Sequence, residues 1–220
     1  MYKVLFISVL LLNPLFNHAI ASSLPDIIKE QVNTAREEVK NDRSVRPAYA
    51  RLMFRLLVNR PEKDEIAFKK ELNLEASSEL KRLETWTAES PDAEIDFIIG
   101  RFYDFGLGVE ENKASSCHWM LKAAELGHAE AQNTVAYCYE KGRGFPVDMN
   151  NAVIWYEKAA AQNNVNGITN LGICYYEGKG VIKNDRKAYQ LFLKASNMGG
   201  EWASIHLKKM RSNGLVFDTH

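Results

Sequence analysis

The three cysteines of the chain, Cys117, Cys138 and Cys174, are the residues best suited to covalent chemistry. Cys117 lies about ten residues before the expected turn at Gly127-His128, and Cys138 lies about ten residues after it. In antiparallel helices these positions fall at the same height, so a disulfide between Cys117 and Cys138 is predicted. Cys174 follows Cys138 by one full repeat of the sequence, and stacked helices stand roughly 8–10 Å apart, whereas bridged Cα atoms lie within about 7 Å. Cys174 is therefore predicted to be buried and free.

Other residue pairs that could support catalysis or metal binding lack the partners they would need. Ser78 and Lys81 have the Ser-x-x-Lys spacing of penicillin-interacting enzymes, but the companion Ser-Asp-Asn and Lys-Thr-Gly elements are absent from the sequence. Cys117 adjoins His118, yet none of the other histidines stands at a zinc-ligand spacing from this pair. The chain is therefore predicted not to be an enzyme and to use no metal or cofactor. A cell-wall or lactam-processing enzyme is the least favoured alternative.

These residues are set in a sequence that repeats every 36 residues, and a fixed period of this kind indicates a solenoid. Each copy carries a Gly-x-Gly pair: Gly106 and Gly108, Gly142 and Gly144, Gly178 and Gly180. Glycine accepts the left-handed backbone that ends a helix, so the pairs predict turns between two helices. The same Gly-x-Gly pairs could also be interpreted as phosphate-binding loops, but such loops need a flanking strand, and no strand is predicted here. The first helix of each copy also carries a small residue, expected to allow close helix packing: Gly100, Ala136 and Gly172.

The predicted fold class is all-α, a solenoid of three 36-residue helix-turn-helix repeats between a helical N-terminal cap and a C-terminal half-repeat. The expected segments are a signal peptide at 1–21, an N-terminal helical region at 22–90, the solenoid at 91–212 and a tail at 213–220. The repeats cover about 93–128, 129–164 and 165–200, followed by a polar capping helix at 201–212. The region 22–90 is expected to hold about four short helices, interpreted as a cap in preference to a separate binding module. Ser90 is the expected N-cap of the first solenoid helix.

The N-terminus has the features of a targeting segment. Lys3 supplies a positive charge, Val4–Phe16 is mostly apolar, and Ala19-Ile20-Ala21 has the small residues of a cleavage site. A membrane anchor is the alternative, but the apolar run is too short to cross roughly 30 Å of hydrocarbon. We therefore expect an exported, soluble mature chain that begins near Ser22 and has no membrane span. The equal numbers of basic and acidic residues, 28 each, argue against a nucleic-acid partner.

The repeat also resembles a known family. The residues that carry the resemblance are Ala129, Ala131, Gln132, Val135, Ala136, Tyr139, Gly142, Gly144, Asp148, Ala152, Trp155, Tyr156, Lys158, Ala159 and Ala160. This pattern resembles the Sel1-like repeat, a relative of the tetratricopeptide repeat, over roughly residues 93–208. The resemblance implies an α/α right-handed superhelix whose first helices line a concave face, and a role in protein-protein recognition. Cysteine-rich members of that family bridge paired helices, and similar exported bacterial proteins include host-interaction factors and periplasmic immunity proteins.

Positions at which the three repeats differ are the candidates for partner binding, because fold-determining positions already explain the agreement. The first-helix positions opposite the core predict a nine-residue patch on the concave face: Phe97, Arg101, Asp104, Asn133, Tyr137, Glu140, Thr169, Ile173 and Tyr176. Aromatic residues and arginine are typical of protein interfaces. The alternative is that some of these side chains pack against the neighbouring helix. The predicted partner is another protein, bound by a periplasmic adaptor or an immunity-type inhibitor of a secreted effector; a secreted host-interaction factor is the alternative.

Overall fold

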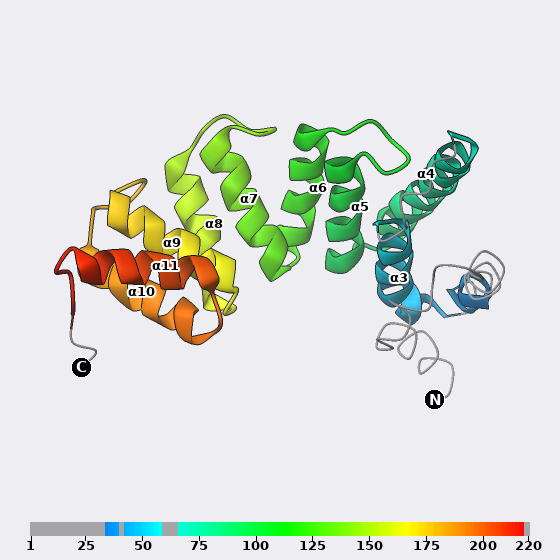
Figure 1. The fold of residues 1–220 in the computed structure, drawn as a ribbon. Helices are drawn as coiled ribbons and strands as arrows, with labels where there is room; N and C mark the ends of the chain where they lie inside the picture. The colour runs from blue at the N-terminus through cyan, green and yellow to red at the C-terminus, as the bar shows by residue number, and fades with distance from the viewer. Residues whose placement is uncertain (1–33, 40–41, 59–65, 218–220) are drawn as a thin grey trace. The chain divides into compact units, whose positions relative to one another are not determined.

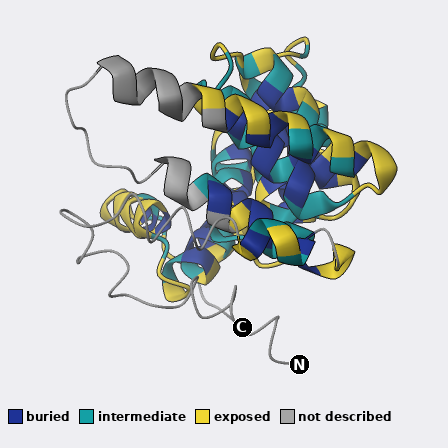
Figure 2. Cartoon of the chain, turned by 90° about the vertical axis from the view of Figure 1, so that its right-hand side faces the viewer, coloured by how far each residue is buried: buried dark blue, intermediate teal, exposed yellow. Residues whose placement is uncertain are grey.

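The computed structural model describes residues 34–39, 42–58 and 66–217 (Figure 1). Within these ranges the chain forms helices and turns and no strand, which confirms the predicted all-α class. Buried residues lie where helices meet, and exposed residues lie on the outer faces (Figure 2). The predicted signal peptide, residues 1–21, lies outside the described residues, as do 22–33 of the predicted cap and 218–220 of the tail. None of the helices in the described ranges combines the length and apolar character needed to cross a bilayer.

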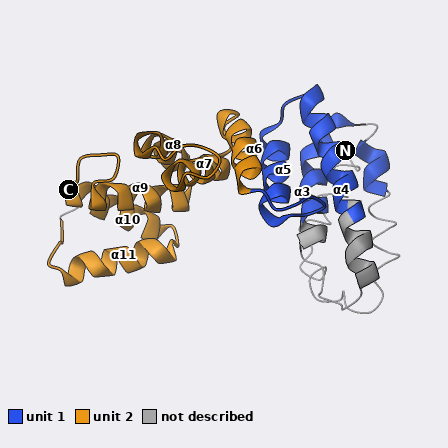
Figure 3. Ribbon diagram, turned by 90° about the horizontal axis from the view of Figure 1, so that it is seen from above, with its two compact units in different colours: residues 1–112 blue, residues 113–220 orange. Residues whose placement is uncertain are grey.

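The chain divides into two compact units, residues 1–112 and 113–220 (Figure 3). The described elements of the first unit are residues 34–39, the short helix η2 (Arg43–Val45), α3 (Arg46–Val58), α4 (Ile66–Glu89) and α5 (Ala93–Phe105). Helix α4 runs for 24 residues where shorter helices were expected, because no Gly or Pro interrupts it. The expected N-cap at Ser90 is wrong. Asp92 directly precedes α5, and its carboxylate accepts hydrogen bonds from the N–H groups of Glu94 and Ile95.

A buried carboxylate joins the helices of the first unit. Glu79 of α4 is 0% exposed and accepts a hydrogen bond from the Tyr49 hydroxyl of α3 at 2.9 Å. Arg36 lies 2.7 Å and Arg82 3.1 Å from the Glu79 carboxylate, so the charge is paired from both sides. A buried charge without such partners would be strongly destabilising. Burial, together with the negative charge of Glu79, raises the pKa of the Tyr49 hydroxyl, so Tyr49 acts here as a neutral donor.

The second unit stacks helices in the order that the repeat predicts. Its elements are α6 (Lys113–Glu125), α7 (Ala129–Lys141), α8 (Met149–Ala161), α9 (Val165–Glu177), α10 (Asp185–Asn197) and α11 (Glu201–Ser212). Val135, Leu171 and Leu207 recur at the repeat period and are all buried. The predicted role of the small residues is confirmed at Gly172, where a Cβ would lie 2.7 Å from the Phe192 ring. The sequence places the start of the repeats near residue 91, whereas the two compact units divide later, between Asn112 and Lys113.

The two glycines of each turn have different tasks. Gly142 ends α7 in the left-handed conformation, with φ 68°, and its N–H donates to the carbonyl of Cys138. Gly180 also has a positive φ, but a Cβ there would lie 2.4 Å from the carbonyl oxygen of Met149, the first residue of α8. The second glycine therefore allows the turn of one repeat to touch the backbone of the repeat before it. Asp148 and Asn184 then cap the second helices by accepting from the N–H groups of Asn151 and Lys187.

Candidate protein-binding site

Helices α7 and α9 carry six of the nine residues predicted to bind a partner. Both are first helices of their repeats, and they contact each other through two asparagines: Asn170 Nδ2 donates to Asn133 Oδ1 at 2.9 Å. The 36-residue period places Asn133, Tyr137 and Glu140 of α7 beside the equivalent positions of α9, which are Thr169, Ile173 and Tyr176. The described part of this surface is thus built from neighbouring helices of one compact unit.

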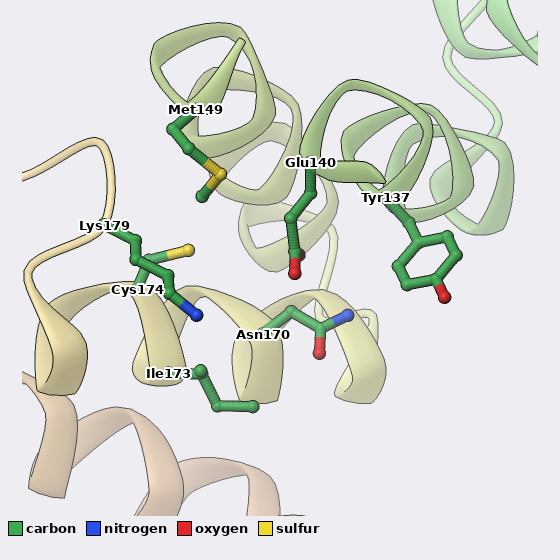
Figure 4. Close-up of a pocket in the computed structure, with 7 residues that line it drawn as sticks. All are labelled: Tyr137, Glu140, Met149, Asn170, Ile173, Cys174 and Lys179. Atoms are coloured by element: carbon green, nitrogen blue, oxygen red, sulfur yellow. The ribbon is translucent and has the colours of Figure 1, made fainter. Parts of the chain in front are cut away.

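A pocket lies between α7, α8 and α9. It is lined by Tyr137, Glu140, Met149, Asn170, Ile173, Cys174 and Lys179, and its cavity volume is about 110 Å³. Three of these residues belong to the predicted patch, and Figure 4 shows the Glu140 carboxylate and the Lys179 ammonium directed into the pocket from α7 and from the turn after α9. Met149 and Lys179 were not predicted because the patch was drawn from the first helices alone, and Asn170 was not predicted because it lies one residue away from the α9 position chosen, Thr169. The signal that could have found Met149 and Lys179 is the second Gly of the turn, which brings Gly180 against Met149.

Hydrogen bonds keep the carboxylate in this pocket charged. Burial by itself raises the pKa of Glu140, but hydrogen bonds from Lys141 Nζ at 2.6 Å and from the Tyr156 hydroxyl at 2.9 Å outweigh it and hold the pKa below its ordinary value. Burial, with the negative charge of Glu140, raises the pKa of the Cys174 thiol to about 11. Because the thiolate is the nucleophile, Cys174 is a weak one at neutral pH.

Positively charged side chains lie near the two aromatic rings of the patch in this unit. Tyr137 is 36% exposed, and Arg143 and Lys141 lie 5.1 Å and 5.5 Å from its ring centroid. The Lys183 ammonium lies 5.6 Å from the ring of Tyr176. Each ring therefore offers an edge or face for a partner beside a positive charge, which is a combination enriched at protein interfaces.

Four patch residues differ from the simple picture of one exposed surface. Thr169 is only 5% exposed and donates its hydroxyl to the carbonyl of Val165, so it contributes little to any surface. The other three, Phe97, Arg101 and Asp104, belong to α5 of the first unit. There the Arg101 guanidinium lies 4.7 Å from the ring of Phe105 and 5.8 Å from that of Phe54. Arg101 thus packs within its own unit, as the alternative in the sequence analysis allowed.

The structure joins Cys117 of α6 to Cys138 of α7 by a disulfide, the pairing expected from their distances to the Gly127-His128 turn, with the Cα atoms 6.1 Å apart. Cys174 is free and buried. The adjacent His118 donates from Nδ1 to the Ala114 carbonyl at 2.8 Å, and its ring makes a tilted contact with the ring of Phe145. Within the described ranges, no group of three His, Cys, Asp or Glu side chains could hold a metal ion.

Comparison with known proteins identifies the repeat. A family model described as the Sel1 repeat matches residues 97–128, 129–164 and 165–200. The chain carries three Sel1 repeats. The Sel1 repeat is a protein-protein interaction fold, generally without enzymatic activity, and the matched segments agree with the repeats predicted from the sequence to within a few residues.

Two solved structures, one described as a Sel1 repeat protein and one as displaying an SLR fold, share the fold. A Sel1 repeat protein from Oxalobacter formigenes is 34% identical with a TM-score of 0.54; the match covers 64% of this chain and 60% of that one. A protective antigen of uropathogenic Escherichia coli with an SLR fold is 25% identical with a TM-score of 0.63, over 83% of this chain and 37% of that one. Cysteine rich protein B of Helicobacter pylori is 28% identical over 58% of this chain and 94% of that one, with a TM-score of 0.47. No curated protein matches the chain.

The Ser-x-x-Lys pair lies outside the residues matched by the Sel1 repeat. Ser78 and Lys81 lie on α4 of the first unit, before the matched repeats, and both are exposed. Cys117, the other residue considered for catalysis or metal binding, is bonded to Cys138 and has no free thiol. The matched repeats instead carry an aromatic, charged and partly hollowed face on α7 and α9.

Proposed function

We propose that this Sel1 repeat protein binds another protein through the exposed face of α7 and α9, with the Glu140 pocket receiving one side chain of the partner. The pocket is the main observation that supports this proposal. Its volume of about 110 Å³ is well below the roughly 300–1,000 Å³ of small-molecule sites, so it suits a single inserted side chain. Tyr137 of α7 and Tyr176 of α9 would supply the aromatic contacts that dominate such interfaces.

The setting we propose is the periplasm, where the chain would serve as an adaptor or as an immunity-type inhibitor of a secreted effector. Two observations support export. The N-terminal segment has the composition of a signal peptide, and Cys117 and Cys138 are disulfide-bonded, which requires an oxidising compartment to persist. The second candidate is a secreted host-interaction factor, and it is favoured by the likeness to a protective antigen of uropathogenic Escherichia coli.

Affinity capture tests the proposed binding face. The chain from Ser22 onward would be used to retain proteins from periplasmic and culture-medium extracts, and each retained protein would be titrated against variants. Tyr137→Ala combined with Tyr176→Ala should weaken binding at least tenfold, because the α7 and α9 face loses both of its tyrosine rings, of which Tyr137 also lines the pocket. Lys158→Ala is the matched control, since Lys158 stacks on Trp155 of α8 and does not line the pocket.

The outcomes separate the proposals. Unchanged affinity of the double tyrosine variant would exclude the α7 and α9 face, whatever the partner is. Retention of one stoichiometric protein from the periplasmic extract supports the adaptor or inhibitor. Retention of host proteins only, together with recovery of the chain from the culture medium, would replace that role with the secreted factor.

A further inference from the structure

The last described helix exposes a tryptophan that the repeat does not require. Trp202 of α11 is 70% exposed, and Ile205, one turn later, is 57% exposed. In the two preceding repeats the position of Trp202 is held by Glu130 and Asn166, both exposed polar residues. A polar capping helix was expected at 201–212. In the structure two apolar side chains, Trp202 and Ile205, lie exposed among the polar residues of α11.

Ile205 occupies the position through which each first helix meets the next one. Its equivalent on α7 is Asn133, which bonds to Asn170 of α9. Its equivalent on α9 is Thr169, which is buried. On its inner side α11 packs against α10, where Ala203, Leu207 and Met210 are buried and His206 stacks on Phe192. The outer face of α11 therefore continues the stacking surface of the repeats, and within the described part of the chain no helix covers it.

We propose that the outer face of α11 binds the same face of a second copy of the chain, with the two α11 helices antiparallel and related by a two-fold axis near Ile205. Residues seven apart lie two turns apart on nearly the same side of a helix. Glu201 and Lys208 are seven apart, and so are Trp202 and Lys209, with Ile205 at the centre of both pairs. All five side chains are exposed.

This spacing makes the face complementary to itself. A two-fold axis reverses the direction of the helix, so Glu201 of one copy comes opposite the partner's Lys208, and Trp202 comes opposite the partner's Lys209. Two ion pairs and two cation–π contacts then flank the central contact between the two Ile205 side chains. A parallel arrangement would place Glu201 against Glu201 and lysine against lysine, so charge selects the antiparallel one.

The dimer should be weak and dependent on concentration. The 12 residues of α11 extend about 18 Å, which is less than the span of an interface that buries about 800 Å² on each partner. Sedimentation velocity over a dilution series of the mature chain measures the association directly. Trp202→Ala should weaken self-association at least tenfold, and Ile154→Ser, which changes an exposed aliphatic residue on α8, should leave it unchanged.

Charge reversal supplies the decisive test. Glu201→Lys alone and Lys208→Glu alone should each abolish the dimer, because both ion pairs across the axis become repulsive. An equimolar mixture of the two variants should form a heterodimer, because both 201–208 pairs across the two-fold axis are then opposite in charge and the Trp202–Lys209 contacts are kept. Circular dichroism of each variant confirms that it is folded.

The proposal is overturned by a monomer at all concentrations, by a dimer that survives Trp202→Ala, or by variants that remain monomeric when mixed. The partner-binding proposal stands or falls separately, because Tyr137→Ala with Tyr176→Ala should leave the dimer intact.

Discussion

The disulfide between Cys117 and Cys138 offers the most direct quantitative test of the structure. It closes a loop with a sequence separation of 21 residues, and it joins two buried positions on neighbouring helices. In the chain-entropy description, closing a loop of that length stabilises the folded state by about 3 kcal/mol, by restricting the unfolded chain. Reduction isolates this contribution better than substitution, because both sulfur atoms stay in the core as small apolar groups.

The measurement is urea unfolding of the chain from Ser22 onward, followed by circular dichroism, with and without reductant. With an m-value of about 1–3 kcal/mol/M, a loss of about 3 kcal/mol lowers the unfolding midpoint of the second unit by about 1–3 M. The variant Cys174→Ala should respond to reductant by the same shift, because Cys174 is free. Identical curves for the oxidised and reduced protein, or peptide mapping without reductant that finds all three thiols free, would refute the reasoning.

Two further predictions concern the turns and the pocket. Gly180→Ala should destabilise the second unit more than Gly199→Ala. Both glycines have a positive φ, at 68° and 86°, but only Gly180 lies against backbone atoms, those of the Met149 carbonyl. Equal changes in the urea midpoint of the two variants would contradict this close approach. Glu140→Gln should lower stability at neutral pH and leave it unchanged in strong acid. The folded-state pKa of Glu140 lies below its unfolded value near 4.5, so the ionised carboxylate stabilises the fold above that value, and this stabilisation disappears as pH falls through the folded pKa. A pH series of urea midpoints for both proteins measures this difference, and a constant difference down to acid pH would show that the Glu140 charge is not involved.

Most of the second unit follows from short-range rules that the sequence displays directly. Val135, Leu171 and Leu207 recur at the repeat period and are buried, and Gly142 ends α7 in the conformation that glycine favours. The cysteine pairing followed from counting residues to a single turn, because two antiparallel helices leave little freedom of register. These inferences share one property: each depends on residues within a single helical hairpin.

Features that depend on contacts between hairpins were not predicted. The approach of Gly180 to Met149 involves backbone from successive repeats, and the same approach brings Met149 and Lys179 into the pocket. Thr169 has the sequence position of a surface residue and is nevertheless buried, since the helical face available to solvent depends on the neighbouring helices. The exposed side of α11 was also missed, because the three lysine and arginine residues near its end suggested a polar helix although Trp202 and Ile205 share a face.

The disulfide also affects the order in which the second unit opens. Stacked repeats unfold most readily from their ends, where a helix has fewer neighbours to lose. Helix α6 is held to α7 by a covalent bond, whereas α11 is held to α10 by noncovalent contacts, among them the stacking of His206 on Phe192 and a hydrogen bond from Arg211 Nε to the Tyr189 hydroxyl at 3.2 Å. Opening should therefore begin at α11 and proceed toward the cross-linked α6–α7 pair. The disulfide thus gives the stack of helices a preferred direction of unfolding.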